Sequence, residues 1–192
     1  MTNRYAWVID LEPHAPDVVA AWRGIDEGRF ISVRREVRRR AGEGSAARTV
    51  PQLAALATAL TAVVQSLPDA AFTLPGGEGD WNVAEAVGHV ATSRAGLVLA
   101  ASLAASNRWP LDAPVVVPGI PGSPVADRPA LVARLEKSQR LIERSARAVE
   151  GHELDPCPLE HPLVGRLRCG EWLLFAGVHD LMHLEQIHKI EA

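Results

Sequence analysis

The sequence predicts an all-α protein: a four-helix bundle with a long crossover between its second and third helices, preceded by an N-terminal extension. The chain has 192 residues, which fits one domain of ordinary size. Its hydrophobic fraction of 47% comes mainly from Ala, Leu and Val, with only 5% aromatic residues, and this mixture favours close-packed helices. Four segments repeat apolar residues at the helical period, and a proline-rich stretch separates the second from the third.

Residues 1–50 differ in composition from the rest and are interpreted as an extension, with residues 51–192 as the bundle domain. The spacing of apolar residues predicts two short helices, near Ala15–Arg23 and Gly28–Ala41. The second contains the basic segment Arg34–Arg40. An acidic partner would suit this segment, but a solvated helix face or a set of intersubunit ion pairs is the favoured interpretation.

The first bundle helix is predicted to begin at Thr49, whose side chain can cap the free backbone N–H groups, with Pro51 in the first turn. The sequence Leu67-Pro68 ends it. Between these limits the apolar residues follow the helical period: Leu53, Leu56, Ala57, Leu60, Val63 and Val64. This pattern predicts a helix with one face in the core.

The second bundle helix follows a glycine-rich segment, residues 76–79, which predicts a flexible link. Asp80 or Asn82 is the expected N-cap, and the helix should reach about Ser106. This helix contains His89, one of seven histidines in the chain.

The connection between the second and third helices contains five prolines that forbid a continuous helix: Pro110, Pro114, Pro118, Pro121 and Pro124. A link of about twenty residues suits a crossover between distant positions in a bundle. The third helix should start after Asp127, with Pro129 in its first turn, and stop at Gly151. A proline-rich loop, residues 152–170, then leads to the fourth helix, residues 170–191.

Composition and charge exclude several classes of protein. The net charge of −3 is too small to indicate a nucleic-acid partner. The first residues lack the apolar core of a signal peptide, and no uninterrupted apolar run reaches about 18 residues, so no membrane span is expected and the protein is predicted to be cytoplasmic. Cys157 and Cys169 are too far apart for a CxxC motif and are interpreted as reduced and structural.

Two histidines of the last helix, His179 and His183, lie four residues apart and therefore on one helical face, roughly 6 Å apart along the axis. This arrangement can hold one metal ion, with His89 as the best third ligand. Three histidines would leave one coordination position for chemistry. The alternative is that the imidazoles are partly exposed or satisfied by neighbours such as Glu85 or Asp180; the residues alone do not decide between the two. His152 and His161 belong to the loop, and nothing in their spacing places them at the site.

Several segments together resemble the DinB/YfiT-like superfamily. They are the sequence from Gly79 to His89, the loop residues 161–167, and the stretch from Glu171 to Ile187 that includes the histidine pair. The resemblance covers roughly residues 51–192. It implies a four-helix bundle of DinB/YfiT type, commonly dimeric, with a divalent metal held by three histidines. Those ligands correspond to His89, His179 and His183.

The resemblance also suggests an activity. It implies a small-molecule enzyme, in which the metal activates a low-molecular-weight thiol for S-transfer or isomerisation. Two alternatives remain: a metal-dependent hydrolase that uses no thiol, and a non-catalytic metal-binding structural or stress-response module. Three neutral imidazoles suit zinc, nickel or ferrous iron, and ligand type alone does not choose among them; zinc or nickel is the favoured metal. Glu85, one turn before His89, is the candidate catalytic residue, although an ordinary solvated carboxylate is the simpler interpretation. The extension would cover the metal site or enlarge a dimer interface.

Overall fold

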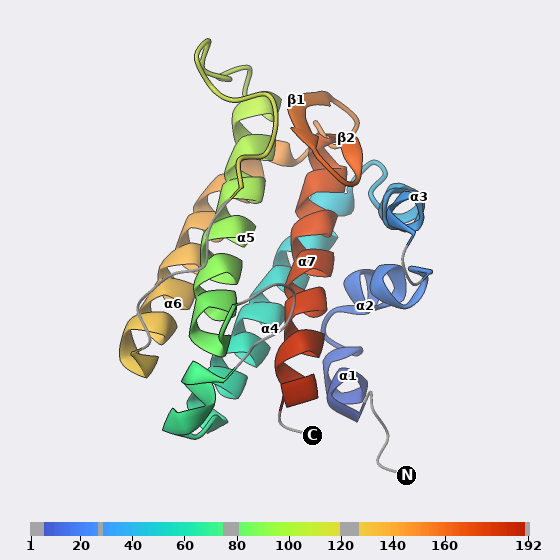
Figure 1. Ribbon diagram of the computed structural model, residues 1–192. Coiled ribbons are helices and arrows are strands. Elements are labelled where there is room, and N and C mark those ends of the chain that lie inside the picture. The colour runs from blue at the N-terminus through green and yellow to red at the C-terminus, as the bar shows by residue number, and fades with distance from the viewer. Residues whose placement is uncertain (1–5, 27–28, 75–80, 120–126, 191–192) are drawn as a thin grey trace.

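Four long helices form the body of the molecule. The computed structural model describes residues 6–26, 29–74, 81–119 and 127–190, with side chains from residue 7 to residue 188. The bundle consists of α4 (Ser45–Ser66), α5 (Val83–Ala105), α6 (Arg128–Ser145) and α7 (Cys169–Ile190), shown in Figure 1. Helix α5 packs against α6 and α7, and α4 packs against the same two helices. The predicted all-α bundle is confirmed.

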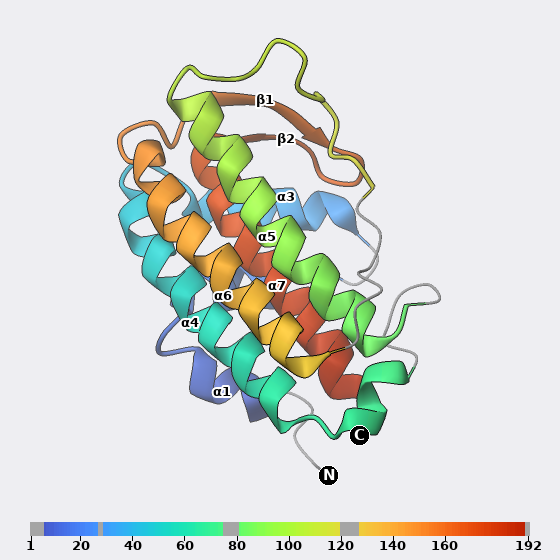
Figure 2. The ribbon, with the colours of Figure 1, turned by 90° about the vertical axis from the view of Figure 1, so that its left-hand side faces the viewer.

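The long crossover has a geometric reason that differs from the expected one. We expected it to join distant helices, but α5 and α6 are neighbours that run in the same direction (Figure 2). A connection between parallel neighbours has to return along the whole bundle, which takes a long segment. The described part of this segment, residues 106–119, contains no helix. The glycine-rich link predicted at residues 76–79 lies outside the described residues.

Helix α4 begins at Ser45, four residues before the predicted start. Gly44 precedes it with a left-handed φ of 68°, and the Ala46 N–H donates to Glu153 Oε1 at 3.3 Å. Thr49 is therefore an interior residue whose hydroxyl donates to the Ser45 carbonyl at 2.8 Å. Pro51 likewise lies inside the helix and not in its first turn. The neighbouring sequence does not predict this start, because Glu153, which is distant in sequence, accepts the hydrogen bond from a backbone N–H of the first turn.

Helices α5 and α6 begin as predicted. Asn82 Oδ1 accepts the Glu85 N–H at 2.8 Å, and Glu85 Oε2 accepts the Asn82 N–H at 2.8 Å, so the two residues form a reciprocal capping box. Pro129 lies in the first turn of α6. Short 3₁₀ helices η1 (Asp69–Thr73) and η2 (Ala146–Val149) follow α4 and α6 respectively.

The loop predicted between α6 and α7 contains an antiparallel hairpin, β1 (Pro156–His161) and β2 (Gly165–Arg168). The strand was not predicted because the prolines of β1 are typical of a loop. Cys157 and Leu159 are nevertheless buried at alternate positions, as in a strand with one face in the core. The crossover pairs with β1 from the other side: the Val117 N–H donates to the Glu160 carbonyl at 2.9 Å. This pairing brings the hairpin and the crossover together at one end of α5 (Figure 2).

Three N-terminal helices precede the bundle: α1 (Ala6–Leu11), α2 (Pro16–Arg23) and α3 (Phe30–Arg40). Helices α2 and α3 match the two predicted short helices, and both pack against α7 (Figure 1). The division into an extension and a separate bundle domain stays a prediction.

The arginine run of α3 forms ion pairs within its own chain. Arg38 Nε donates to Glu171 Oε1 at 2.8 Å, and Arg40 Nη1 donates to Glu36 Oε2 at 2.8 Å. Glu36 and Glu171 are almost fully buried. These arginines therefore neutralise buried carboxylates, a role that neither sequence interpretation of the run included.

Helices α4 and α5 are long and apolar enough, by length and composition, to cross a membrane. Within the protein, 39% of the apolar window of α4 and 72% of that of α5 are buried. Their apolar faces form the bundle core, which includes Leu53, Leu56 and Val87. The apolar window of α5 is mostly buried, as in the core helix of a soluble protein, whereas less than half of that of α4 is buried.

Candidate metal centre

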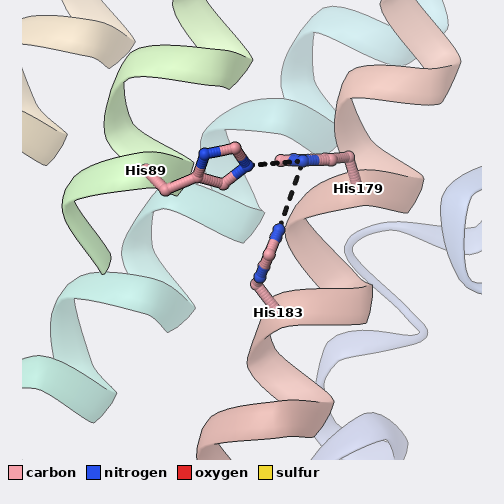
Figure 3. Close-up of side chains that lie close together, drawn as sticks. All are labelled: His89, His179 and His183. Atoms are coloured by element: carbon pink, nitrogen blue, oxygen red, sulfur yellow. Dashed lines mark hydrogen bonds between the residues drawn. The ribbon is translucent and has the colours of Figure 1, made fainter. Parts of the chain in front are cut away.

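The structure brings the three predicted histidines together. His89 comes from α5, and His179 and His183 come from successive turns of α7 (Figure 3). His179 Nε2 lies 3.3 Å from His89 Nε2 and 3.2 Å from His183 Nε2. The three candidate ligand atoms all lie within 4.8 Å of one another.

These distances fit a single divalent ion. Zinc binds imidazole nitrogens at about 2.0–2.1 Å in tetrahedral geometry, which separates two ligand nitrogens by about 3.3 Å. The two shorter separations in the cluster, 3.2 and 3.3 Å, agree with that value. In the described part of the chain the group has three ligands, one fewer than a closed structural zinc site takes.

The hydrogen bond of His183 shows which of its ring nitrogens is unprotonated and directs a lone pair into the cluster. Gln186 Oε1 lies 2.6 Å from His183 Nδ1. An amide oxygen can only accept, so Nδ1 carries the proton and Nε2 is the acceptor in the neutral ring. Ser93 Oγ, 3.2 Å from His89 Nε2, can donate its hydroxyl proton to that nitrogen.

Without a cation the cluster is poorly satisfied. If Nε2 of His89 and of His183 both accept, His179 Nε2 has to donate one proton to two acceptors. His179 Nδ1 is then an acceptor, and this atom is buried with no hydrogen-bond partner among the described residues. A cation bound to all three Nε2 atoms removes the conflict among these three nitrogens, since each then directs its lone pair at the ion. His179 Nδ1 then carries the proton and still has no partner among the described residues.

The histidines of α7 are poised in the neutral form that binds metals. Burial lowers the pKa of His179 well below its usual value, and the nearby His183 and His89 rings lower it further. Burial, followed by the charge of His89, lowers the pKa of His183 to about 4. Both rings are therefore unprotonated near neutral pH, so a metal ion does not have to displace protons there.

Aromatic side chains hold two of the rings. The Trp81 ring packs on His89 with centroids 4.6 Å apart, and Phe175 lies 6.3 Å from His179, one turn earlier on α7. These contacts restrict the imidazole orientations without competing for their nitrogens.

The carboxylates proposed as alternative partners of the histidines have other partners. Glu85 Oε2 is occupied by the capping box of α5. Asp180 Oδ2 accepts from Arg94 Nε at 2.8 Å, and both side chains are fully buried. The catalytic role of Glu85 stays a prediction, and the capping box gives that residue a structural role already.

A large cavity adjoins the cluster. Its volume is about 640 Å³, and its wall includes His89, His179 and His161. His161 could not be placed at the site from its spacing in the sequence, because its position depends on the hairpin. At the end of β1 its ring packs on Phe175 at 5.2 Å, and burial lowers its pKa. The other loop histidine, His152, is exposed beside Asp155, and His188 stacks on Trp7.

The fold and the histidine cluster agree with a comparison against known families. A model described as the DinB superfamily matches residues 14–187. The chain belongs to the DinB superfamily. The predicted family is thereby confirmed, and the match includes α2 and α3, which lie in the predicted extension. No curated protein and no solved structure matches this DinB-superfamily chain.

Proposed function

We propose that this DinB-superfamily protein is a metal-dependent enzyme in which His89, His179 and His183 hold one divalent ion, zinc or nickel. The observation that carries the proposal is the convergence of three Nε2 atoms at the wall of a large cavity. A metal that only stabilises the fold is normally closed in by four protein ligands, whereas this cluster adjoins space for a substrate.

The chain's own residues prepare the site. Gln186 fixes the tautomer of His183, so that the lone pair of its Nε2 is available to the ion. Trp81 and Phe175 pack beside the His89 and His179 rings and restrict their orientation. A divalent ion held by neutral imidazoles supplies Lewis acidity, lowering the pKa of a thiol or of a water molecule.

The finer proposal is that the metal activates a low-molecular-weight thiol for S-transfer or isomerisation. It is supported by the family and by a neutral ligand set that leaves the positive charge of the ion available to a thiolate. Turnover of electrophiles with and without added thiol tests it. Turnover that needs no thiol would indicate a metal-dependent hydrolase. Metal binding without turnover of any kind would indicate a non-catalytic structural or stress-response module.

The first experiment is metal content. We expect one zinc or nickel ion per chain in protein purified without an affinity tag, measured by elemental analysis. His183→Ala removes one of three ligands and should lose the ion, together with the stability that the ion supplies. His152→Ala is the matched control, since His152 lies on the surface away from the cluster. Stoichiometric metal in His183→Ala would refute the ligand assignment.

Two further proposals concern the assembly and its place in the cell. We propose a homodimer, which light scattering during size-exclusion chromatography tests directly. A cytoplasmic location is also proposed, supported by the burial of most of the long apolar helix α5. Cell fractionation would show the protein in the membrane fraction if that proposal is wrong.

A further inference from the structure

The cavity beside the histidine cluster has an unusual division between polar and apolar lining. Among the described residues that line it there is no Asp, Glu, Lys or Arg. Its polar side chains are Ser93 and the histidines His89, His161 and His179. Everything else is aliphatic, aromatic, proline or glycine. A highly polar ligand would find few partners along most of this wall.

The apolar lining extends away from the histidines along α5. The wall follows α5 from His89 to Leu103, fourteen residues further along, which is about 20 Å at the usual rise per residue. The crossover closes this end with Trp109, and β1 contributes Leu159. Leu99 and Leu163 remain 37% and 54% exposed although they line the cavity. Exposed apolar surface within an elongated cavity is typical of a site that a ligand fills.

Besides the Ser93 hydroxyl, the histidine end offers an uncharged ring donor, His161. His161 Nδ1 accepts the Leu163 N–H at 3.2 Å, so in the neutral ring Nε2 carries the proton. His161 thus differs from the three cluster histidines, which converge through Nε2 on one another. It is suited to donate to a polar group of a ligand and not to bind the metal.

We propose that this cavity binds the substrate, and that the substrate is a predominantly apolar small molecule with one polar group. This polar group would lie at the histidine cluster and accept a hydrogen bond from His161. The inference rests on the proposed function, since it identifies the substrate class of that same site. The apolar chain would extend along α5 toward Trp109. In the thiol-dependent reaction proposed above, this apolar molecule is the electrophilic substrate and not the thiol.

Straight-chain alcohols are suitable probes for a direct binding test. Dissociation constants for butan-1-ol, hexan-1-ol and octan-1-ol would be measured by titration calorimetry, with tryptophan fluorescence as a second readout because Trp81 and Trp109 line the cavity. Burial of two further methylenes should tighten binding about tenfold at each step. Equal affinities along the series would overturn the proposal.

A pair of variants at one position locates the binding. A Cβ added at Gly96, which lines the cavity on α5, meets no atom within 4 Å. Gly96→Leu should therefore fold and place its side chain in the cavity, weakening octan-1-ol binding about tenfold. Gly96→Ala is the matched control and should change the dissociation constant by less than about threefold, because it adds a single methyl group. Unchanged binding in Gly96→Leu would place the alcohols elsewhere and overturn the proposal.

The orientation of the ligand has its own test. His161→Phe keeps an aromatic ring against Phe175 and Trp172 but removes the donor. Octan-1-ol should then bind between about two- and tenfold more weakly, the usual range for one hydrogen bond, while the increment per methylene stays the same. An unchanged dissociation constant would refute the placement of the polar group at this end.

The same titrations on zinc-loaded and chelator-treated protein separate this inference from the proposed function. The chain-length increment and the effect of Gly96→Leu are expected in both forms, since neither depends on the ion. If elemental analysis finds no metal but the alcohols behave as described, only the proposed function fails. If metal is bound but the alcohol series fails, only the substrate class is wrong.

Discussion

A single amide contact decides how one of the three histidines can act. An imidazole binds a metal only through a nitrogen that carries no proton, and the partner of its other nitrogen sets which one that is. For His183 this partner is Gln186 Oε1 at 2.6 Å. Both side chains lie on the same stripe of α7, three residues apart, so one helix supplies the ligand and the group that orients it.

We therefore expect Gln186→Leu to weaken metal binding without unfolding the protein. Loss of the acceptor frees the His183 ring to rotate and to change its tautomer, and such changes next to a ligand typically reduce metal affinity 10–100-fold. Competition with a chromophoric chelator measures the effect. Gln186→Glu keeps an acceptor at the same place and should retain affinity near that of the wild type. Equal affinity of Gln186→Leu and the wild type would show that the contact does not orient the ligand.

The lowered pKa of Glu36 makes the free energy of unfolding depend on pH. Hydrogen bonds from Arg40 first, and then from Arg35, lower the pKa of this buried carboxyl from 4.5 to about 2. A carboxylate whose pKa is lower in the folded protein stabilises it above the unfolded pKa and loses that contribution as the pH falls. Because the arginines are partly exposed, we expect Glu36→Gln to lower the free energy of unfolding by only about 1–2 kcal/mol near neutral pH.

Urea unfolding of both proteins at a series of pH values checks this. The difference between wild type and Glu36→Gln should be constant above about pH 5 and shrink between about pH 5 and pH 2. A difference that is independent of pH across this range would mean that the charge of Glu36 does not contribute.

Among the elements, the close contact of α2 with α7 depends on a glycine, Gly177, which has no side chain at the contact. A Cβ at Gly177 of α7 would lie 2.9 Å from Val18 Cγ2 of α2 and 3.1 Å from Leu56 Cδ1 of α4. Gly96 of α5, by contrast, faces open space. The same substitution should therefore have opposite effects at these two helical glycines.

Gly96→Ala should raise the free energy of unfolding by about 0.5–1 kcal/mol, because alanine is the better helix former. Gly177→Ala gains the same propensity but overpacks the contact, so we expect a net loss of about 1–2 kcal/mol. Chemical denaturation of the two variants beside the wild type measures both signs. Stabilisation by Gly177→Ala would show that α2 can move away from α7 at little cost.

The sequence predicted those elements whose signals are local. Apolar periodicity and caps placed α5, α7 and the start of α6 within a residue or two, and the spacing of His179 and His183 follows from helix geometry alone. The predicted end of α6 at Gly151 was wrong: the α-helix ends at Ser145, and the 3₁₀ helix η2 follows it. The start of α4 was not predicted, because a backbone N–H of its first turn, that of Ala46, donates to Glu153, 107 residues further along the chain. The position of His161 was not predicted for a similar reason. It depends on the register of a hairpin whose proline content is typical of a loop.

Across the whole molecule, one guanidinium group connects all four bundle helices. Arg94 of α5 donates to Asp180 of α7 at 2.8 Å, to Gln139 of α6 at 3.1 Å and to the Leu53 carbonyl of α4 at 2.8 Å. Asp180 directly follows His179, and Arg94 lies five residues after His89. The pair therefore fixes α5 against α7 close to the level at which their histidines meet.

This arrangement predicts a strong coupling between the two residues. Burial raises the pKa of Asp180 to about 6 against the opposing effect of Arg94, and Asp180 Oδ1 has no hydrogen-bond partner among the described residues. Arg94→Met would leave the carboxyl buried without its cation, and we expect a loss of about 3–5 kcal/mol in the free energy of unfolding. Arg94→Met combined with Asp180→Leu removes both charges and should recover most of that loss, since apolar pairs of similar volume often replace buried ion pairs at little cost.

Urea unfolding of the wild type, the two single variants and the double variant gives the coupling energy, which we expect to exceed about 2 kcal/mol. Metal affinity measured in the double variant then separates stability from alignment. If the pair holds the register between His89 and His179, the double variant will be stable and yet bind metal more weakly than the wild type. Full affinity in the stable double variant would show that helix packing alone aligns the three rings, and that Arg94 serves only the fold.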